Sequence, residues 1–251
     1  IIDGEPSLDV WAMDVARFGN YASSDYGTIK SSKNYERRFI MTFSNETLPK
    51  GRKQKTTALY DRFISKGAVM GDSFGLESVL WFANDPKDAY EEPTIKRSRS
   101  HDYVSKEVKN VRENVGVTEI ANFSKHEFQG PDARKFLNYV LAGRIPKPGR
   151  ICLNPMLTPK GKLYGDLTVA CLNENKFIVF GSGAVQEMHR RWFENYLKNF
   201  NVVYKNRSDD FHGLALSGPK SRDLLQKLFR ENISNENFKF RDVRKMYVAG
   251  V

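Results

Sequence analysis

A strand–glycine–proline–helix pattern occurs twice in this chain and restricts its fold more than any other sequence feature. Residues 126–131 (HEFQGP) and 214–219 (LALSGP) both end in Gly-Pro, and an arginine follows each proline at the same spacing, Arg134 and Arg222. Proline in the first turn of a helix loses no hydrogen bond, because that amide has no partner within the helix. The two stretches therefore predict an internal pseudo-repeat. The side chains expected to point inward from the two helices are Phe136, Leu137, Val140 and Leu141, and Leu224, Leu225, Leu228 and Phe229.

The residues around the two repeats alternate between strand and helix signals. Apolar runs predict strands at residues 151–153, 167–172 and 176–180. Asn173-Glu174-Asn175 is typical of a hairpin turn between the last two. Apolar residues at helical spacing predict helices at 101–115 and 184–199. This mixture predicts an α+β fold class.

We expect three segments along the chain, at residues 1–35, 36–97 and 98–251. A stretch rich in proline and charge at 84–99 is typical of a linker before the last segment. In the first segment one amphipathic helix is predicted by apolar residues at helical spacing, Leu8, Trp11, Val15 and Phe18.

The second segment contains two short patterns, one that predicts a strand and one that predicts a helix. Residues 38–43 (RFIMTF) predict a strand. Thr57 is expected to cap a short helix that ends at Gly67, since threonine favours the first position and glycine the position after the last turn.

Charge and cysteine content exclude several classes of protein. The 40 lysines and arginines exceed the 30 acidic residues and give a net charge of +10, but they are scattered and form no basic stripe with interleaved aromatic residues. Nucleic-acid binding is therefore not expected. The only two cysteines, Cys152 and Cys171, lie in apolar runs and predict free thiols in a reducing compartment. No run of about 18 apolar residues predicts a membrane span, and because the chain does not begin with methionine we expect an internal fragment.

Few residues carry a catalytic signature. Residues 181–183 (GSG) follow a strand and precede a helix, but Gln186 stands where a dinucleotide-binding loop needs a third glycine. The histidines, His101, His126, His189 and His212, show no metal-ligand spacing, so no metal is expected.

Asp166 is the acid that stands out. It follows Gly165 at the start of an apolar strand, where partial burial would raise the pKa of its carboxyl group and suit it to acid–base chemistry. The structural alternative is a turn carboxylate that accepts hydrogen bonds from backbone amides.

Residues 161–169 (GKLYGDLTV) resemble the Gly-Gly-x-x-Asp-Asp-Leu-x-Val region of the glycine-cleavage aminomethyltransferase, or T-protein, family. The last acid of that motif is the family's folate-contacting carboxylate and falls on Asp166, while the preceding acid is Gly165 here. Residues 116–123 are similar to another family segment, whose apolar member at the folate site falls on Phe123. The family's asparagine after the central hairpin falls on Ser182. The resemblance thus places the folate site at Phe123, Leu153, Asp166, Thr168 and Ser182, with Asp166 as the catalytic residue.

The rest of the chain resembles the dimethylglycine and sarcosine dehydrogenase branch. Residues 3–6 with 9–18 look like the end of a flavin-binding oxidoreductase domain, and residues 57–61 with 74–82 look like its central linking domain. The implied order is the tail of a flavin domain at 1–35, a small linking domain at 36–97, and the N-terminal part of a folate-binding domain at 98–251.

The resemblance implies a reaction in two steps. A flavin part outside this chain would use FAD to oxidise an N-methyl group to an iminium. The one-carbon unit would then reach tetrahydrofolate and give methylenetetrahydrofolate. Asp166 would assist proton transfer at the folate nitrogen, and Phe123 would pack against the pterin.

Several alternatives remain open on the sequence. The amine could be dimethylglycine or sarcosine, and the electron acceptor an electron-transfer flavoprotein or oxygen. A regulatory relative without catalysis, or an RNA-linked one, would share the same domain. The expected location is the cytoplasm in a bacterium or the mitochondrial matrix in a eukaryote.

Overall fold

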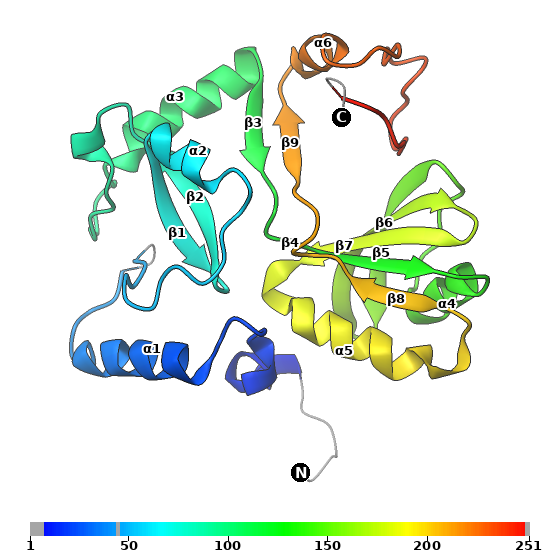
Figure 1. The fold of residues 1–251 in the computed structure, drawn as a ribbon, viewed down its shortest axis with the longest axis horizontal. Helices are drawn as coiled ribbons and strands as arrows, with labels where there is room; N and C mark the ends of the chain where they lie inside the picture. The colour runs from blue at the N-terminus through cyan, green and yellow to red at the C-terminus, as the bar shows by residue number, and fades with distance from the viewer. Residues whose placement is uncertain (1–7, 44–45, 249–251) are drawn as a thin grey trace. The chain divides into compact units, whose positions relative to one another are not determined.

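The computed structural model describes residues 8–43 and 46–248 (Figure 1). The signals expected within residues 1–7, and the side chain of Leu8, lie outside the described residues. The chain forms two compact units, and each is built from separate stretches of sequence. One unit comprises residues 1–17, 123–211 and 222–251, and the other comprises residues 18–122 and 212–221.

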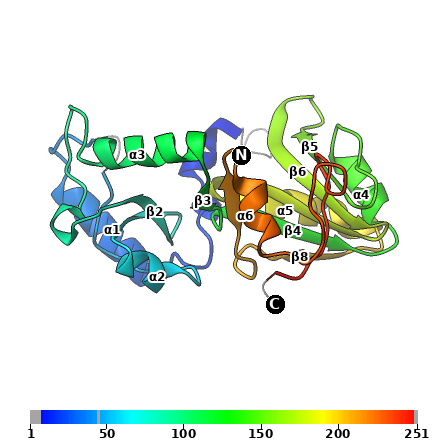
Figure 2. The ribbon, with the colours of Figure 1, turned by 90° about the horizontal axis from the view of Figure 1, so that it is seen from above.

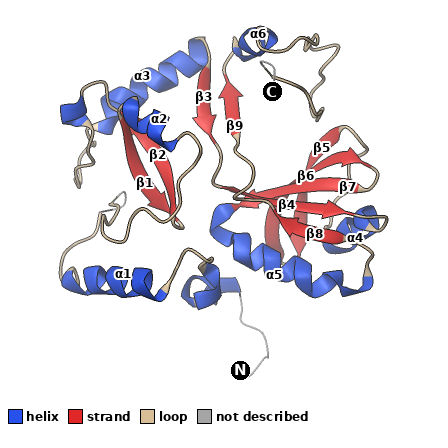
Figure 3. Cartoon of the chain, in the orientation of Figure 1, coloured by secondary structure: helices blue, strands red, loops and turns tan. Residues whose placement is uncertain are grey.

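The first unit is organised around a five-stranded antiparallel sheet with the order β5-β6-β7-β4-β8. Its strands are β4 (Phe123–Gln129), β5 (Arg150–Leu157), β6 (Leu163–Asn173), β7 (Lys176–Ser182) and β8 (Val203–Asn206). Helices α4 (Ala133–Val140) and α5 (Gln186–Tyr196) lie beside this sheet (Figures 1 and 3). Their apolar side chains pack in one core with side chains of its strands. The three strands and the α5 helix expected between the repeats are confirmed, and the strands are longer than predicted.

The alternation of side chains along the strands separates a packed face from an open face. On β6, Leu167 and Val169 are fully buried. Asp166, between the buried Gly165 and Leu167, is exposed. On β7, Phe177 and Val179 are fully buried in the same way. These side chains meet Phe136 and Leu137 of α4 and Phe193 of α5 in one apolar core.

The two repeats have matching local geometry. Gly130 has φ of 150°, and a Cβ there would lie 2.4 Å from the carbonyl oxygen of Asn201. Gly218 has φ of 117°, and a Cβ there would lie 2.4 Å from the carbonyl oxygen of Asn114. Both positions therefore require glycine.

The two repeat arginines also act alike. Arg134 donates to the carbonyl of Pro146 at 3.1 Å, and Arg222 donates to the carbonyl of Ile233. The second helix, α6 (Ser221–Gln226), is shorter than expected, so Leu228 lies beyond it and is 43% exposed. The prediction that Leu228 points into the core is therefore wrong.

The second unit contains the β1–β2 hairpin and the β3–β9 pair. Its elements are α1 (Ser24–Glu36), α2 (Tyr60–Ser65), β1 (Ala68–Ser73), β2 (Leu76–Phe82), α3 (Ser100–Glu113), β3 (Gly116–Glu119) and β9 (Leu214–Ser217). Helix α2 contacts β1. Helix α3 contacts β2, and both are labelled in Figure 2. Trp81 is buried against Tyr103 of α3, with the ring centroids 5.1 Å apart. The helix predicted at 101–115 is confirmed as α3.

Three local predictions are wrong. The amphipathic helix expected around Trp11 is replaced by two short 3-10 helices, Leu8–Met13 and Val15–Arg17, because the Asp14 side chain accepts from the amide of Ala16 and interrupts the helix. The strand expected at 38–43 is absent: Phe39 is 92% exposed, and no described strand pairs with this stretch.

The cap expected from Thr57 is also not made. Among the described residues the side chain of Thr57 has no hydrogen-bond partner, and Leu59 takes the N-cap position of α2 without a side-chain bond.

The described residues also form three further short 3-10 helices, Pro86–Asp88, Gly183–Val185 and Leu197–Asn199.

Candidate folate site

The five residues expected at the folate site all lie in the first unit, on four neighbouring strands. Phe123 begins β4, Leu153 is on β5, Asp166 and Thr168 are on β6, and Ser182 ends β7. Each alternates with buried residues that face α4 and α5, so all five belong to the open face of the sheet. The sequence predicted that β6 and β7 are neighbours through their hairpin turn, but it did not show that β5 and β4 lie beside them.

The strand register sets which candidate residues are adjacent. Leu153 lies directly opposite Thr168 on the neighbouring strand, and Phe123 lies directly opposite Ser182. Cross-strand partners have their Cβ atoms about 5 Å apart. Asp166 is paired with Pro155, which has no amide hydrogen to donate, and Thr168 is paired with Phe180 on its other side. Continuing that register by two residues places Asp166 opposite Ser182.

Asp166 is exposed, not partly buried. It lies inside β6, which begins at Leu163, and not at a turn. Within the described part of the chain, no donor forms a hydrogen bond or ion pair with its carboxylate. The partial burial expected for Asp166 is therefore absent, and so are the backbone hydrogen bonds of a turn carboxylate. The carboxylate is left available on the open face.

Two apolar side chains flank this carboxylate without being buried. Phe123 is 45% exposed and Leu153 is 67% exposed. Thr168 is half-buried, and Ser182 is exposed with its hydroxyl accepting from the amide of Ala184 at 3.3 Å. The open face therefore offers an aromatic ring, an aliphatic side chain, a hydroxyl and a carboxylate to a ligand. These groups suit a flat heteroaromatic ring with N–H donors.

Lys125 is a residue of this face that the sequence reasoning missed. It is buried, with 3% of its surface exposed, and its ammonium donates to the carbonyl of Phe123 at 2.7 Å and to that of Ser208 at 3.4 Å. Burial lowers the pKa of Lys125, and the nearby charge of Asp209 opposes that shift. The alternation of Phe123, Lys125 and Glu127 along β4 was the available signal. Lys125 fixes the start of β4 and thereby the position of Phe123.

On the packed face, two histidines lie beneath the candidate site. His126 and His189 are 0% and 1% exposed, with their ring centroids 6.3 Å apart. His126 Nδ1 lies 2.8 Å from the hydroxyl of Tyr204. Burial lowers the pKa of His126 to about 3, with His189 contributing, and burial lowers the pKa of His189 to about 4. Burial also raises the pKa of Tyr204.

His189 explains why Gly165 stands where the resembling motif has an acid. A Cβ at Gly165 would lie 2.8 Å from His189 Nε2. A side chain at position 165 would clash with the imidazole unless the ring moved. An acid at this position is therefore compatible only with a displaced imidazole.

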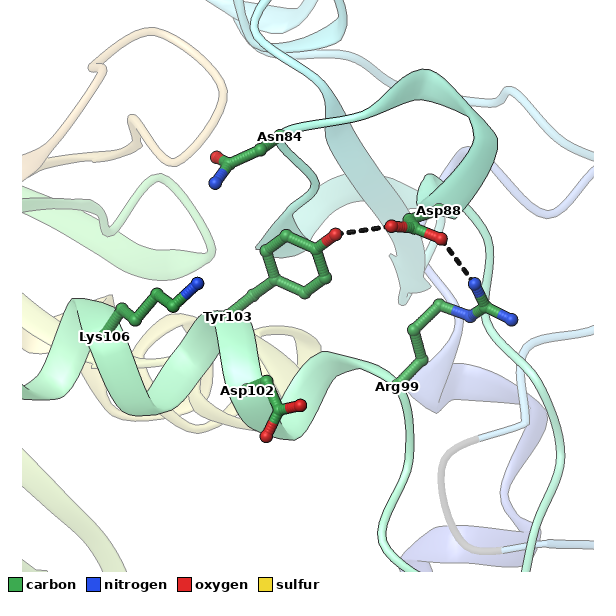
Figure 4. A pocket seen from close by; sticks show the side chains of 6 residues that line it. All are labelled: Asn84, Asp88, Arg99, Asp102, Tyr103 and Lys106. Atoms are coloured by element: carbon green, nitrogen blue, oxygen red, sulfur yellow. Dashed lines mark hydrogen bonds and ion pairs between the residues drawn. The ribbon is translucent and has the colours of Figure 1, made fainter.

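A separate hollow of about 370 Å³ lies in the second unit and contains none of the candidate folate residues (Figure 4). Asp88 accepts from the hydroxyl of Tyr103 at 2.6 Å and from Arg99 at 2.5 Å, so its carboxylate is already paired. The residues that line the hollow are Asn84, Asp88, Arg99, Asp102, Tyr103 and Lys106.

Neither a metal site nor a membrane span is present in the part of the chain that the structure describes. No group of three or more His, Cys, Asp or Glu residues there is arranged to hold a metal ion. None of the described helices has the length and apolar character needed to cross a bilayer. Both cysteines are free; Cys171 is buried and Cys152 is half-buried.

Comparison with known families agrees with this fold. The model of the GCVT N-terminal domain matches residues 59–251, and the model of the FAD dependent oxidoreductase central domain matches residues 3–57. The chain therefore belongs to the GCVT N-terminal domain family. This confirms the predicted family resemblance and the α+β fold class.

Individual relatives match the chain over almost all of its length. Human mitochondrial dimethylglycine dehydrogenase is 32% identical over 255 residues, which cover 100% of this chain and 29% of that protein. The 4-methylaminobutanoate oxidase (formaldehyde-forming) of Paenarthrobacter nicotinovorans is 24% identical, and the match covers 99% of this chain and 30% of that protein. The chain thus spans less than a third of the length of these relatives.

A solved structure shows the same fold. The glycine cleavage system aminomethyltransferase T from Bartonella henselae superimposes with a TM-score of 0.60 at 20% identity, covering 77% of this chain and 48% of that one.

Proposed function

We propose that this chain is part of a dimethylglycine dehydrogenase-like enzyme and that the open face of its five-stranded sheet binds tetrahydrofolate. The observation that carries the proposal is the exposed, unpaired carboxylate of Asp166 on a face that also presents Phe123 and Leu153. The similarity to dimethylglycine dehydrogenase over the whole chain supports the same reading.

Each candidate residue would make a different contact with tetrahydrofolate. Phe123 would pack against the pterin ring, and Leu153 would cover its edge. Thr168 would offer its hydroxyl, and Asp166 would hold the proton exchanged at the folate nitrogen and stabilise positive charge there. Tetrahydrofolate, when bound, supplies the nitrogens that take up a one-carbon unit.

The flavin chemistry belongs to the proposed larger protein. The matched oxidoreductase segment is a central domain, and the chain contains no glycine-rich phosphate-binding loop of the dinucleotide type. We therefore assign FAD to the part outside this chain, where it would oxidise an N-methylated amine such as dimethylglycine, or sarcosine as the alternative. The division into segments 1–35, 36–97 and 98–251 is part of this proposal. So is a mitochondrial matrix location in a eukaryote, or a cytoplasmic one in a bacterium.

The proposal is tested by calorimetric titration of the full-length protein with tetrahydrofolate. We expect saturable binding that Asp166→Asn weakens about tenfold, because a charge-assisted hydrogen bond contributes about 1.5–3 kcal/mol. Asp61→Asn is the matched control, since Asp61 is an exposed acid on α2 in the other unit. Wild-type protein that is folded and flavin-loaded but does not bind tetrahydrofolate would refute the assignment.

A further inference from the structure

The imidazole of His189 packs against the backbone of two glycines, Gly165 and Gly181, on the packed face of the sheet. His189 is on α5 and is 1% exposed. A Cβ at Gly165 of β6 would lie 2.8 Å from its Nε2, and a Cβ at Gly181 of β7 would lie 3.1 Å from its Nδ1. Real Cβ atoms do not approach at the first of these distances, so the ring occupies space that the glycines leave free.

Each of these glycines directly precedes a candidate folate residue. Gly165 precedes Asp166, and Gly181 precedes Ser182. Because successive side chains of a strand point to opposite faces, Asp166 and Ser182 stand on the other side of the backbone that the ring contacts. The ring therefore lies directly behind the backbone that carries both residues.

The ring is itself held in place from behind. It lies in edge-to-face contact with His126, whose Nδ1 is 2.8 Å from the hydroxyl of Tyr204. Phe193, one turn further along α5, is fully buried and contacts the same His126 ring at a centroid distance of 5.1 Å. The packing leaves little room for the imidazole to move away from the sheet.

We propose that His189 is a positioning residue for the folate face, an inference that rests on the function proposed above. The imidazole determines the distance between α5 and the strands β6 and β7. It thereby holds Asp166 and Ser182 in the position and orientation that the ligand requires. The residue does not touch the ligand and acts only through the backbone at Gly165 and Gly181.

The test is a compensation experiment on the full-length protein. Gly165→Ala adds a methyl group where the ring stands and is expected to weaken tetrahydrofolate binding about tenfold. His189→Ala removes the ring and is expected to weaken binding several-fold. In the double variant the new methyl group has room, so the double variant should bind within about threefold of His189→Ala alone. Dissociation constants are measured by calorimetry at a temperature at which thermal unfolding shows every variant to be folded.

Gly71→Ala is the matched control, because its Cβ would lie 2.8 Å from Leu80 Cδ2 in the other unit. It is expected to lower the unfolding temperature without changing the dissociation constant. The inference is overturned if Gly165→Ala leaves binding unchanged, or if the Gly165→Ala and His189→Ala effects simply add. Wild-type protein that does not bind tetrahydrofolate would instead overturn the proposed function, and the inference with it.

Discussion

Phe123 presents an aromatic ring to solvent at the start of β4, although its carbonyl is held by the buried Lys125. An exposed ring on a fixed backbone is suited to stacking on a flat ligand, because little conformational entropy is lost on binding. Lys125 explains how a half-exposed side chain at a strand end can keep a defined position.

Replacement of Phe123 by alanine should weaken tetrahydrofolate binding about tenfold, since an aromatic contact contributes roughly 0.5–1.5 kcal/mol beyond its buried area. Stability should change little, because the ring is 45% exposed. Calorimetry and thermal unfolding measure the two effects. Phe39→Ala, at a side chain that is 92% exposed in the other unit, is the control that should change neither. Equal binding by Phe123→Ala and wild type would remove Phe123 from the site.

At the scale of elements, the repeat glycines terminate strands where the backbone leaves no space for a side chain. Gly130 has φ of 150°, and a Cβ added there would lie only 2.4 Å from the carbonyl oxygen of Asn201. Gly161 also has a positive φ, 75°, but nothing lies within 4 Å of its Cβ position. A side chain at Gly161 would therefore meet only the strain of a positive φ, whereas a side chain at Gly130 would meet that strain and a steric clash.

Gly130→Ala should lower the free energy of unfolding by roughly 3 kcal/mol or more, because strain and clash act together. Gly161→Ala should cost only about 1–2 kcal/mol, the penalty of the left-handed conformation alone. Urea denaturation of both variants measures the difference. Similar losses for the two would mean that the Asn201 carbonyl moves aside freely.

The sequence predicted elements well where apolar spacing was regular and poorly where it was not. The helix α4 was predicted correctly, because Phe136, Leu137 and Val140 form one buried stripe. Helix α1 was missed, since it has no buried residues and its main signal is Ser23, which accepts from the amide of Tyr26. The run at 38–43 has strand-forming residues but no partner strand among the described residues, and a strand forms only where another strand pairs with it.

For the candidate site, sequence reasoning could name residues but could not assemble them. Spacing along the chain says nothing of the order β5-β6-β7-β4, which brings Leu153, Thr168 and Phe123 to one face. Lys125 was missed although it alternates with Phe123 along β4, and the role of His189 was missed because packing against a glycine has no sequence signature. The family resemblance supplied the five candidate residues, and the register showed which of them are neighbours.

At the scale of the whole molecule, the buried histidines make stability depend on pH. An unfolded histidine binds a proton below about pH 6.5, whereas burial lowers the pKa to about 3 for His126 and about 4 for His189 in the folded chain. Between these values the unfolded state binds more protons than the folded state, so the contribution to stability is complete above pH 6.5 and is lost as the pH falls.

The free energy of unfolding should therefore decrease from pH 6.5 to pH 4, by up to roughly 1.4 kcal/mol per pH unit for each histidine. Urea midpoints at pH 7, 5.5 and 4.5 measure the slope. The two buried histidines contribute roughly equally to this slope, so His126→Phe should remove about half of their joint contribution. An unaltered slope in His126→Phe would show that His126 is not the titrating group.

The central claim is that the open face of the five-stranded sheet holds tetrahydrofolate, and a crystal structure of the full-length protein soaked with tetrahydrofolate tests it most directly. We predict the pterin ring against Phe123 and Leu153, with the carboxylate of Asp166 within hydrogen-bond distance of a ring nitrogen. A ligand bound elsewhere, for example in the hollow around Asp88 and Tyr103, with this face left empty, would contradict the account.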